Sequence, residues 1–219
     1  MLTRSGLPLP PGRARALKRA VDLVVSALIL VATLPVFLIV SGLIYLEDGG
    51  PVLFRQRRVG LGRREFELLK FRTMKPCHPL MDAAEEVGSD HPLVTRTGRV
   101  LRRFKLDELP QLINVLRDDM SLVGPRPTVP AQVAHYDAFQ SRRLLMRPGM
   151  TGWAQVNGNV RLSWNERITL DVWYVDHWSL RLDARILART LSVVLFGENP
   201  NDHALRQARI YANGSGRSG

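Results

Sequence analysis

The longest apolar feature of the chain is a run of 24 uncharged residues, from 23 to 46. As a helix it would cover the roughly 30 Å hydrocarbon core of a bilayer. Pro35 stands at the centre of the run. Because proline removes a backbone hydrogen bond and clashes with the preceding turn, the pattern predicts a helix–break–helix over 20–46. Neither half would be long enough to cross a bilayer alone.

Basic residues flank this run equally. They are Arg4, Arg13, Arg15, Lys18 and Arg19 before it, and Arg55, Arg57, Arg58, Arg63 and Arg64 after it. A segment with such flanks has no positive-inside bias. We therefore predict a re-entrant segment with both ends on the cytoplasmic side and Pro35 as the membrane break. A side chain such as Thr33 would cover the freed backbone. A straight helix that spans the bilayer is the alternative.

Two shorter patterns follow. Strand-forming residues on both sides of Gly60-Leu61-Gly62 predict a β-hairpin with strands at 51–59 and 65–72. Apolar residues at positions 109, 112, 113 and 116 then have helical spacing. They predict a helix over about 108–117 that Asp107 caps at its N-terminus.

An amphipathic pattern begins at residue 180. Its apolar face consists of Leu180, Ala184, Leu187, Ala188, Leu191, Val194 and Leu195. Arg181, Arg185 and Arg189 recur on another face, and Trp173 and Trp178 come just before. Apolar residues beside an arginine row predict an interfacial helix on anionic lipid, with a soluble core helix as the alternative. The polar tail over 198–219, rich in glycine at its end, predicts weak order or late docking.

These elements predict one mainly helical α+β domain over residues 1–219, associated with a membrane as a monotopic protein. It would comprise the re-entrant segment at 20–46, a cytosolic region at 50–197 that contains the β-hairpin and the interfacial amphipathic helices, and the tail. A chain of this length can bury a sizeable core. The single cysteine, Cys77, excludes an intrachain disulfide and fits a reducing compartment.

Charge narrows the classes of partner. The chain has 31 Lys and Arg against 20 Asp and Glu, a net charge of +11, so it attracts phosphate groups. Nucleic acid is not the expected partner, because no motif that reads nucleic acid is present. The basic residues bracket an apolar run and an acidic pair, which favours anionic membrane lipid and phosphate-bearing substrates.

Adjacent carboxylates supply the candidate chemistry. Asp107 and Glu108 follow Arg102 and Lys105 closely, and Arg126 lies in a rigid Gly-Pro-Arg-Pro turn further on. Neighbouring cations favour an ionised carboxylate with a lowered pKa. An ionised aspartate can attack phosphorus or hold a divalent cation. The simpler alternative is that the pair only caps a helix.

Five phrases of the chain resemble a known family. They are KFRTM at 70–74, LDELPQLINVL at 106–116, DMSLVGPRP at 119–127, RPGMTGWAQVNG at 147–158 and LDVWYVDHWSLRLD at 170–183. Together they resemble the bacterial sugar transferases, and among these the small monotopic phosphoglycosyl transferases with a re-entrant helix. The resemblance runs from about residue 18 to residue 197 in the expected order.

The resemblance implies that a sugar 1-phosphate moves from a UDP-sugar to polyprenol phosphate, with UMP as the other product. Asp107 would be the nucleophile and carry a covalent phosphosugar intermediate. Glu108, together with Asp107, would hold Mg²⁺. The enzyme would work at the cytoplasmic face of the bacterial inner membrane, in the first membrane step of glycoconjugate assembly.

The resemblance also implies a set of substrate-binding residues. Arg126, between Pro125 and Pro127, corresponds to a phosphate-binding arginine, and Arg102 to a basic residue near the acidic pair. Further candidates for the anionic site or for nucleotide and sugar contacts are Lys70, Arg72, Arg147 and Gln155.

Three positions depart from the family pattern. Leu34 replaces the serine that often precedes the proline, and Asn159 follows Asn-Gly where many members have arginine. Asp118 stands where many members have glycine and is predicted to be a surface or turn substitution. The alternatives to a transferase are a membrane phosphatase or pyrophosphatase and a non-catalytic membrane scaffold. The residues do not identify the sugar, and a homodimer is left open.

Overall fold

The computed structural model describes residues 12–75, 91–196 and 200–214, which form a mainly helical α+β structure with small sheets. The helices are α1 (Gly12–Ala32), α2 (Leu34–Asp48), α3 (Arg96–Arg103), α4 (Gln111–Leu116), α5 (Pro130–Val133), α6 (Trp153–Val156), α7 (Trp164–Asp176), α8 (Leu180–Phe196) and α9 (Asp202–Gly214). The strands are β1 (Leu53–Val59), β2 (Glu65–Phe71), β3 (Ser121–Val123) and β4 (Gly149–Thr151). The predicted mainly helical α+β class is confirmed. Cys77, which was predicted to form no disulfide, lies outside the described residues.

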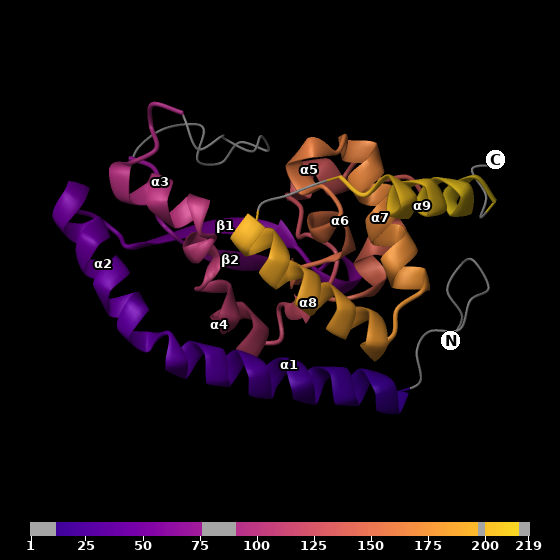
Figure 1. Cartoon of the computed structure of the whole chain (residues 1–219), viewed down its shortest axis with the longest axis horizontal. Coiled ribbons are helices and arrows are strands. Elements are labelled where there is room, and N and C mark those ends of the chain that lie inside the picture. Colours follow the sequence, from indigo (N-terminus) through magenta and orange to yellow (C-terminus); the bar gives the residue numbers. More distant parts are fainter. Residues whose placement is uncertain (1–11, 76–90, 197–199, 215–219) are drawn as a thin grey trace.

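A bent pair of helices runs along one edge of the molecule (Figure 1). α1 ends at Ala32, α2 begins at Leu34, and the two helices meet at an angle of 59°. Pro35 lies in the first turn of α2, where a missing N–H breaks no helical hydrogen bond. Thr33 Oγ1 donates a hydrogen bond of 2.7 Å to the carbonyl of Ile29. The predicted break is therefore confirmed. The Ile29 carbonyl also accepts from the Thr33 N–H at 2.9 Å, so cover of the backbone freed at Pro35 by Thr33 stays a prediction.

The helix pair extends beyond the predicted limits of 20–46, because polar residues at both ends continue the two helices. Within the described part of the chain, neither helix alone has the length and apolar composition to cross a bilayer. The bent pair passes the same test only when the two helices are taken together.

α1 buries a polar stripe and exposes most of its apolar residues, while Val25 and Leu30 are partly buried against the main core. Lys18, Asp22 and Ser26 are its buried residues, whereas Leu28 and Val31 are 66% and 73% exposed. This is the reverse of a helix on the surface of a soluble protein, which turns its apolar face inward. The burial of α1 therefore depends on polar contacts with the rest of the protein.

Lys18 and Asp22 make these contacts with two different elements. The Lys18 Nζ lies 2.7 Å from a carboxylate oxygen of Asp183 on α8. The Asp22 carboxylate accepts hydrogen bonds from the Ser121 hydroxyl, at 2.7 Å, and from the backbone N–H of Leu122, at 3.2 Å. The prediction that Lys18 is a flanking charge for lipid is therefore wrong, because its side chain is buried in an ion pair with Asp183.

Arg19 is also an internal contact rather than a free flanking charge. Its guanidinium donates at 2.8 Å to the carbonyl of Val115 at the C-terminal end of α4, which also accepts from the Asp118 N–H at 3.2 Å. It also forms an ion pair of 2.8 Å with Asp118. Arg19 thus fixes α1 against the end of α4.

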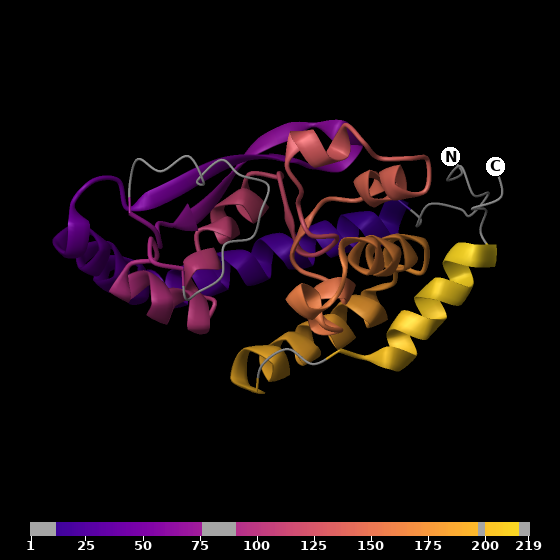
Figure 2. The same ribbon diagram turned by 90° about the horizontal axis from the view of Figure 1, so that it is seen from above.

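The predicted hairpin is present and pairs antiparallel, from Leu53 opposite Phe71 to Val59 opposite Glu65. A short 3-10 turn, Leu61–Arg63, joins the strands. The hairpin and the helices α8 and α9 lie on opposite sides of the molecule (Figure 2). A second sheet, in which β3 and β4 pair in parallel, was not predicted.

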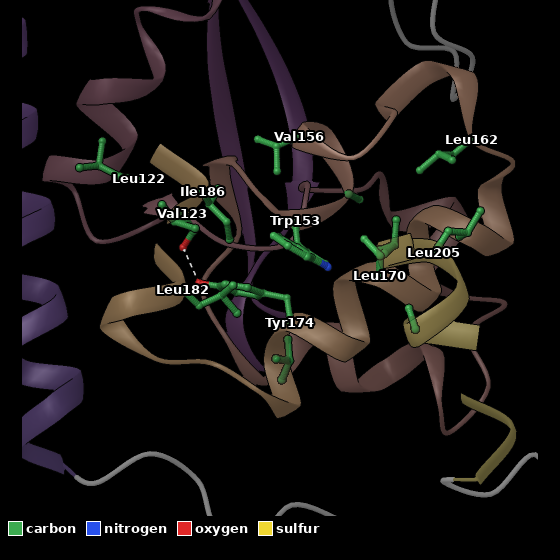
Figure 3. Packing of buried hydrophobic residues seen from close by; sticks show 14 of the residues in the cluster. Leu122, Val123, Trp153, Val156, Leu162, Leu170, Tyr174, Leu182, Ile186 and Leu205 are labelled. Atoms are coloured by element: carbon green, nitrogen blue, oxygen red, sulfur yellow. Dashed lines mark hydrogen bonds between the residues drawn. The ribbon is translucent and has the colours of Figure 1, made fainter. Parts of the chain in front are cut away.

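Buried residues of β3, α6, α7, α8 and α9 form the main core (Figure 3). Trp153, Leu170 and Ile186 meet there, and the Tyr174 hydroxyl donates to the carbonyl of Val123 at 3.3 Å. This core fixes β3 and, with it, the turn that follows β3 in the sequence. The chain after β3 contains the Gly-Pro-Arg-Pro motif.

The C-terminal segment forms a docked helix. α9 buries Ala204, Leu205, Ala208 and Ala212, and Tyr211 accepts a hydrogen bond of 3.0 Å from Arg142. The prediction of weak order is wrong for 202–214, because alanines at helical spacing allow close packing on α7. Late docking stays open, and 197–199 and 215–219 lie outside the described residues.

The apolar face predicted for α8 points largely outward. The buried residues of α8 are Leu182, Asp183 and Ile186, whereas Leu191 and Leu195 are 68% and 74% exposed. The soluble core helix was the alternative prediction, and only the first half of α8 has that character. The described residues therefore leave several apolar side chains at the C-terminal end of α8 uncovered.

Replacing Lys18 by alanine tests whether the polar stripe holds α1. The Lys18→Ala variant leaves Asp22 and Asp183 buried without their cation, so the free energy of unfolding should fall by about 3 kcal/mol. Chemical unfolding in a mild detergent measures the change. Arg15→Ala removes an exposed cation from the same helix and should change it by less than about 0.5 kcal/mol. Equal effects of the two variants would contradict the assigned role of Lys18.

Candidate active site

Asp107 and Glu108 lie in a 3-10 turn, Leu106–Glu108, and not at the start of a helix. Lys105 before them has a left-handed backbone with φ of 56°, and α4 begins only at Gln111, with Pro110 in the N-cap position. The predicted N-cap role of Asp107 is therefore wrong. Apolar spacing identifies the buried face but does not distinguish a 3-10 turn from the first turn of an α-helix.

Glu108 is the point where three segments of the chain meet. The Lys70 Nζ, from β2, lies 2.8 Å from Glu108 Oε1. Arg126, from the turn after β3, approaches the same oxygen at 3.8 Å. The structure thus brings together residues 70, 108 and 126, which are far apart in the sequence.

Asn114 holds β2 beside the acidic turn. Its side-chain oxygen accepts a hydrogen bond of 3.0 Å from the backbone N–H of Leu69, and its amide group donates one of 2.7 Å to the carbonyl of Glu67. Asn114 is fully buried. The side chain continues the hydrogen-bonding edge of β2 and so fixes the distance from Lys70 to Glu108.

The two carboxylates have different ionisation behaviour. Burial raises the pKa of Asp107, and the charge of Lys70 offsets this only in part. Burial would also raise the pKa of Glu108, but Lys70 and Arg126 outweigh it and lower the pKa to about 2. The expectation that neighbouring cations lower a pKa holds for Glu108 and is wrong for Asp107, because desolvation dominates there.

Arg102 lies close to Asp107, as predicted. Its charge acts to lower the pKa of Asp107, and its Nε donates a hydrogen bond of 2.9 Å to the Thr73 hydroxyl. α3 can lie this close because Gly98 has no side chain: a Cβ there would be 2.2 Å from the carbonyl oxygen of Thr73. Arg102 is thus placed by backbone packing between α3 and the end of β2.

The Gly-Pro-Arg-Pro turn packs directly on the segment around β4. A Cβ added to Gly124 would lie 2.3 Å from the carbonyl oxygen of Arg147, and one added to Gly149 would lie 2.0 Å from the backbone nitrogen of Gly124. The Gly149 N–H also donates to the carbonyl of Pro125 at 2.9 Å. Contact between two backbones therefore supports the turn that presents Arg126.

Other predicted site residues make contacts away from the carboxylates. The Arg72 guanidinium forms an ion pair with Asp48 and donates to the carbonyl of Gly49, at the end of α2. It therefore links the hairpin to the helix pair. Arg147 forms an ion pair of 2.6 Å with Asp118. The structure does not bring either arginine to Glu108.

Gln155 is buried in α6, close to Gly152. Its amide nitrogen and oxygen have no hydrogen-bond partner among the described residues. Asn159, at the position where many relatives have arginine, is buried with φ of 40°. The prediction that Gln155 contacts nucleotide or sugar stays a prediction.

Sequence reasoning missed Asn114 and Thr73, which position Lys70 and Arg102. Both stand inside quoted phrases of the resemblance, at 106–116 and 70–74. The available signal for Asn114 was that a polar residue interrupts the apolar residues of the phrase at 106–116. Thr73 had no such signal, because its role depends on α3, which is distant in the sequence.

Comparison with known proteins agrees with a site for phosphate chemistry. The sequence model described as bacterial sugar transferase matches residues 13–197. The chain is 44% identical over 182 residues to the uncharacterized sugar transferase EpsL of Bacillus subtilis (strain 168), which amounts to 83% of this chain and 89% of that protein.

Two further relatives have more specific names. The chain is 43% identical over 205 residues to the UDP-glucose:undecaprenyl-phosphate glucose-1-phosphate transferase of Caulobacter vibrioides, covering 90% of this chain and 76% of that protein. It is 43% identical over 194 residues to the undecaprenyl-phosphate glucose phosphotransferase of Komagataeibacter xylinus, covering 83% of this chain and 36% of that longer protein.

The cluster of Lys70, Glu108 and Arg126 suits chemistry on phosphate groups, and the comparisons identify the class. The chain belongs to the bacterial sugar transferase family. It is a phosphoglycosyl transferase, as the phrases quoted from its sequence predicted.

The opposite pKa shifts of the two carboxylates predict opposite effects on stability. The raised pKa of Asp107 means that its ionised form costs folding free energy. Asp107→Asn should therefore increase the free energy of unfolding at neutral pH. The gain should be absent below the ordinary pKa of aspartate, grow as the pH rises through the raised pKa, and stay constant above it.

Glu108→Gln is the matched variant and should behave in the opposite way. The pKa of Glu108 is about 2 in the folded protein, so its stabilising contribution is present above about pH 4.5 and is lost as the pH falls toward 2. At neutral pH the variant should lose on the order of 2 kcal/mol. Chemical unfolding over a pH series measures both changes, and the same sign for both variants would contradict this assignment.

Proposed function

We propose that this enzyme transfers a sugar 1-phosphate from a UDP-sugar to undecaprenyl phosphate. The products are an undecaprenyl diphosphate sugar and UMP. The observation that carries the proposal is the convergence of Lys70 and Arg126 on Glu108, next to Asp107. The printed names of the relatives from Caulobacter vibrioides and Komagataeibacter xylinus support the same reaction.

The proposed reaction has two displacements at phosphorus. A carboxylate oxygen of Asp107 attacks the phosphorus that carries the sugar, and the bond from this phosphorus to the UMP oxygen breaks. UMP leaves with that electron pair. A phosphate oxygen of undecaprenyl phosphate then attacks the same phosphorus, the bond to Asp107 breaks, and the free carboxylate is restored.

The raised pKa of Asp107 supports its role as nucleophile. A more basic carboxylate is a better nucleophile when it is ionised, and burial removes the water that would otherwise solvate it. Glu108 has a low pKa and stays ionised, so it can hold Lys70 and Arg126 in place before the substrate binds. The environment thus gives two adjacent carboxylates different roles.

The basic residues provide electrostatic stabilisation. Lys70 and Arg126 approach from one side of the turn, and Arg102 lies on the side of α3. In phosphoryl transfer most of the catalysis comes from positioning and from stabilising charge on the phosphoryl oxygens. These cations therefore bind the donor diphosphate and stabilise the charge that develops on it.

Mg²⁺ fits the donor set of the site. Mg²⁺ prefers oxygen ligands and is commonly held by one or two carboxylates together with substrate phosphates. Asp107 and Glu108 are adjacent carboxylates in a partly enclosed turn, and they would hold the ion with the donor diphosphate completing its ligands. When bound, the ion would supply positive charge that neutralises the diphosphate.

We place the enzyme at the cytoplasmic face of the bacterial inner membrane. Support comes from the exposed apolar residues on three helices, among them Val31 of α1, Leu38 of α2 and Phe196 of α8, which are 73%, 69% and 80% exposed. Burying such residues in lipid is favourable. α1 and α2 would enter one leaflet and leave it on the same side, in contact with anionic lipid.

Trapping of the sugar phosphate on Asp107 tests the reaction. Wild-type enzyme, Mg²⁺ and radiolabelled UDP-sugar should give a labelled protein whose adduct maps to Asp107 by mass spectrometry. Asp107→Asn should abolish the label and lower transfer by on the order of 10³-fold or more. Asp137 is an exposed aspartate, and Asp137→Asn is the control. This variant should retain both the labelling of the protein and the transfer of the sugar phosphate.

Each alternative has its own outcome in this assay. Free phosphate that does not depend on undecaprenyl phosphate would indicate a phosphatase or pyrophosphatase. Full turnover of Asp107→Asn would remove Asp107 as the nucleophile. Assay of several UDP-sugars identifies the donor.

Pro35→Ala tests the membrane topology. Restoring the backbone N–H should straighten the helix pair and carry one end of it across the bilayer. Cysteines introduced at each end of the pair, in a background without Cys77, are labelled from one side of sealed vesicles. Leu34→Ala changes an adjacent exposed residue without altering the backbone and is the control. Same-side labelling of both ends in Pro35→Ala would show that Pro35 does not determine the topology.

A further inference from the structure

Two residues of the Arg126 turn can form backbone hydrogen bonds only through their carbonyl groups. Pro125 and Pro127 have no N–H to donate. Their carbonyls accept hydrogen bonds from the Gly149 N–H, at 2.9 Å, and from the Arg58 guanidinium, at 3.1 Å. The orientation of the Arg126 side chain therefore depends on the donors that reach these carbonyls.

The carbonyl of Arg126 itself is held by a buried side chain. Arg143 Nη2 donates to it at 3.0 Å and also lies 2.6 Å from a carboxylate oxygen of Asp171 on α7. Arg143 and Asp171 are only 4% and 1% exposed. One nitrogen of Arg143 thus joins the core of the protein to the residue that approaches Glu108.

Aromatic side chains fix the plane of the Arg143 guanidinium. It lies 5.8 Å from the ring centre of Tyr136 and 5.5 Å from that of Trp164. The Tyr136 hydroxyl accepts a hydrogen bond from Arg143 and donates one of 3.2 Å to Thr128. Thr128 directly follows the turn, so this cluster holds the turn at Arg126 and at its end.

The neighbouring Arg142–Asp176 ion pair provides a comparison for the Arg143–Asp171 ion pair. Arg142 and Asp176 come from the same two segments as Arg143 and Asp171 and form a second buried ion pair. Arg142 then donates a hydrogen bond of 3.0 Å to the hydroxyl of Tyr211 on α9. Both pairs therefore join the same segments, and Arg143 in addition donates to the carbonyl of Arg126.

We propose that Arg143, held by Asp171, is a positioning residue for Arg126 in the transfer reaction. It fixes the carbonyl of Arg126 so that the Arg126 guanidinium points toward Glu108 and the donor diphosphate. The inference rests on the proposed function, because Arg126 is there the group that binds donor phosphate. A planar guanidinium suits this role, since it can donate to several acceptors while it lies near aromatic rings.

Arg143→Lys is the first test, with Arg142→Lys as the matched control. A misplacement of Arg126 by about 1 Å should lower kcat/KM for the UDP-sugar by on the order of tenfold to a hundredfold, with a raised KM. Arg142→Lys should lower the thermal midpoint to a similar extent but leave kcat/KM within about twofold. Equal losses of kcat/KM in both variants would overturn the inference.

Combination with Arg126→Ala separates positioning from general destabilisation. If Arg143 acts through Arg126, adding Arg143→Lys to Arg126→Ala should cause no further loss of kcat/KM. Losses that multiply would overturn the inference. If Arg143→Lys does not fold, Asp171→Asn keeps the shape of its partner and is used in the same two comparisons.

Crystal structures of the two variants provide a readout that does not need turnover. Arg126 Nη1 lies 3.8 Å from Glu108 Oε1, so Arg143→Lys should increase this distance by about 1 Å and Arg142→Lys should leave it unchanged. An unchanged distance in both variants would overturn the inference. A wild-type enzyme that releases no UMP from any UDP-sugar would overturn the proposed function instead, and the variant structures would still decide the placement of Arg126.

Discussion

The burial of Lys18 between Asp22 and Asp183 is the interaction on which the rest of the structure depends. A charged side chain is stable inside a protein only when it is paired, and this pairing determines which face of α1 turns inward. Asp22 also holds β3 through Ser121 and Leu122. Since the turn with Arg126 directly follows β3, one buried network connects the apolar helix pair to the candidate active site.

A second constraint is the crowding of charge around the acidic turn. Asp107 and Glu108 are neighbours in the sequence, but burial dominates the pKa of one and cations dominate that of the other. Lys70 and Arg126 neutralise Glu108 and leave Asp107 as the less stabilised anion. Two carboxylates whose pKa values are separated by their surroundings are a common arrangement for different roles in one reaction.

Much of the site could be predicted from the sequence because family phrases and local rules cover it. Pro35 predicted the helix break and the glycines near residue 61 predicted the hairpin. The resemblance to the family implied that Lys70, Glu108 and Arg126 belong to one site. Arg72 was grouped with Lys70 on one strand face, but a strand pattern does not say which element covers that face. Asp48 of α2 covers it here.

The sequence by itself determined the family, the helix pair, the hairpin and the acidic pair, because these depend on residues close together in the chain. Only the tertiary structure decided that α1 packs through polar residues, that α9 docks on α7 and that Arg143 holds the Arg126 turn. Each of these depends on contacts between residues far apart in the sequence. Desolvation likewise has no local signal, so the raised pKa of Asp107 followed only from the way the whole chain buries it.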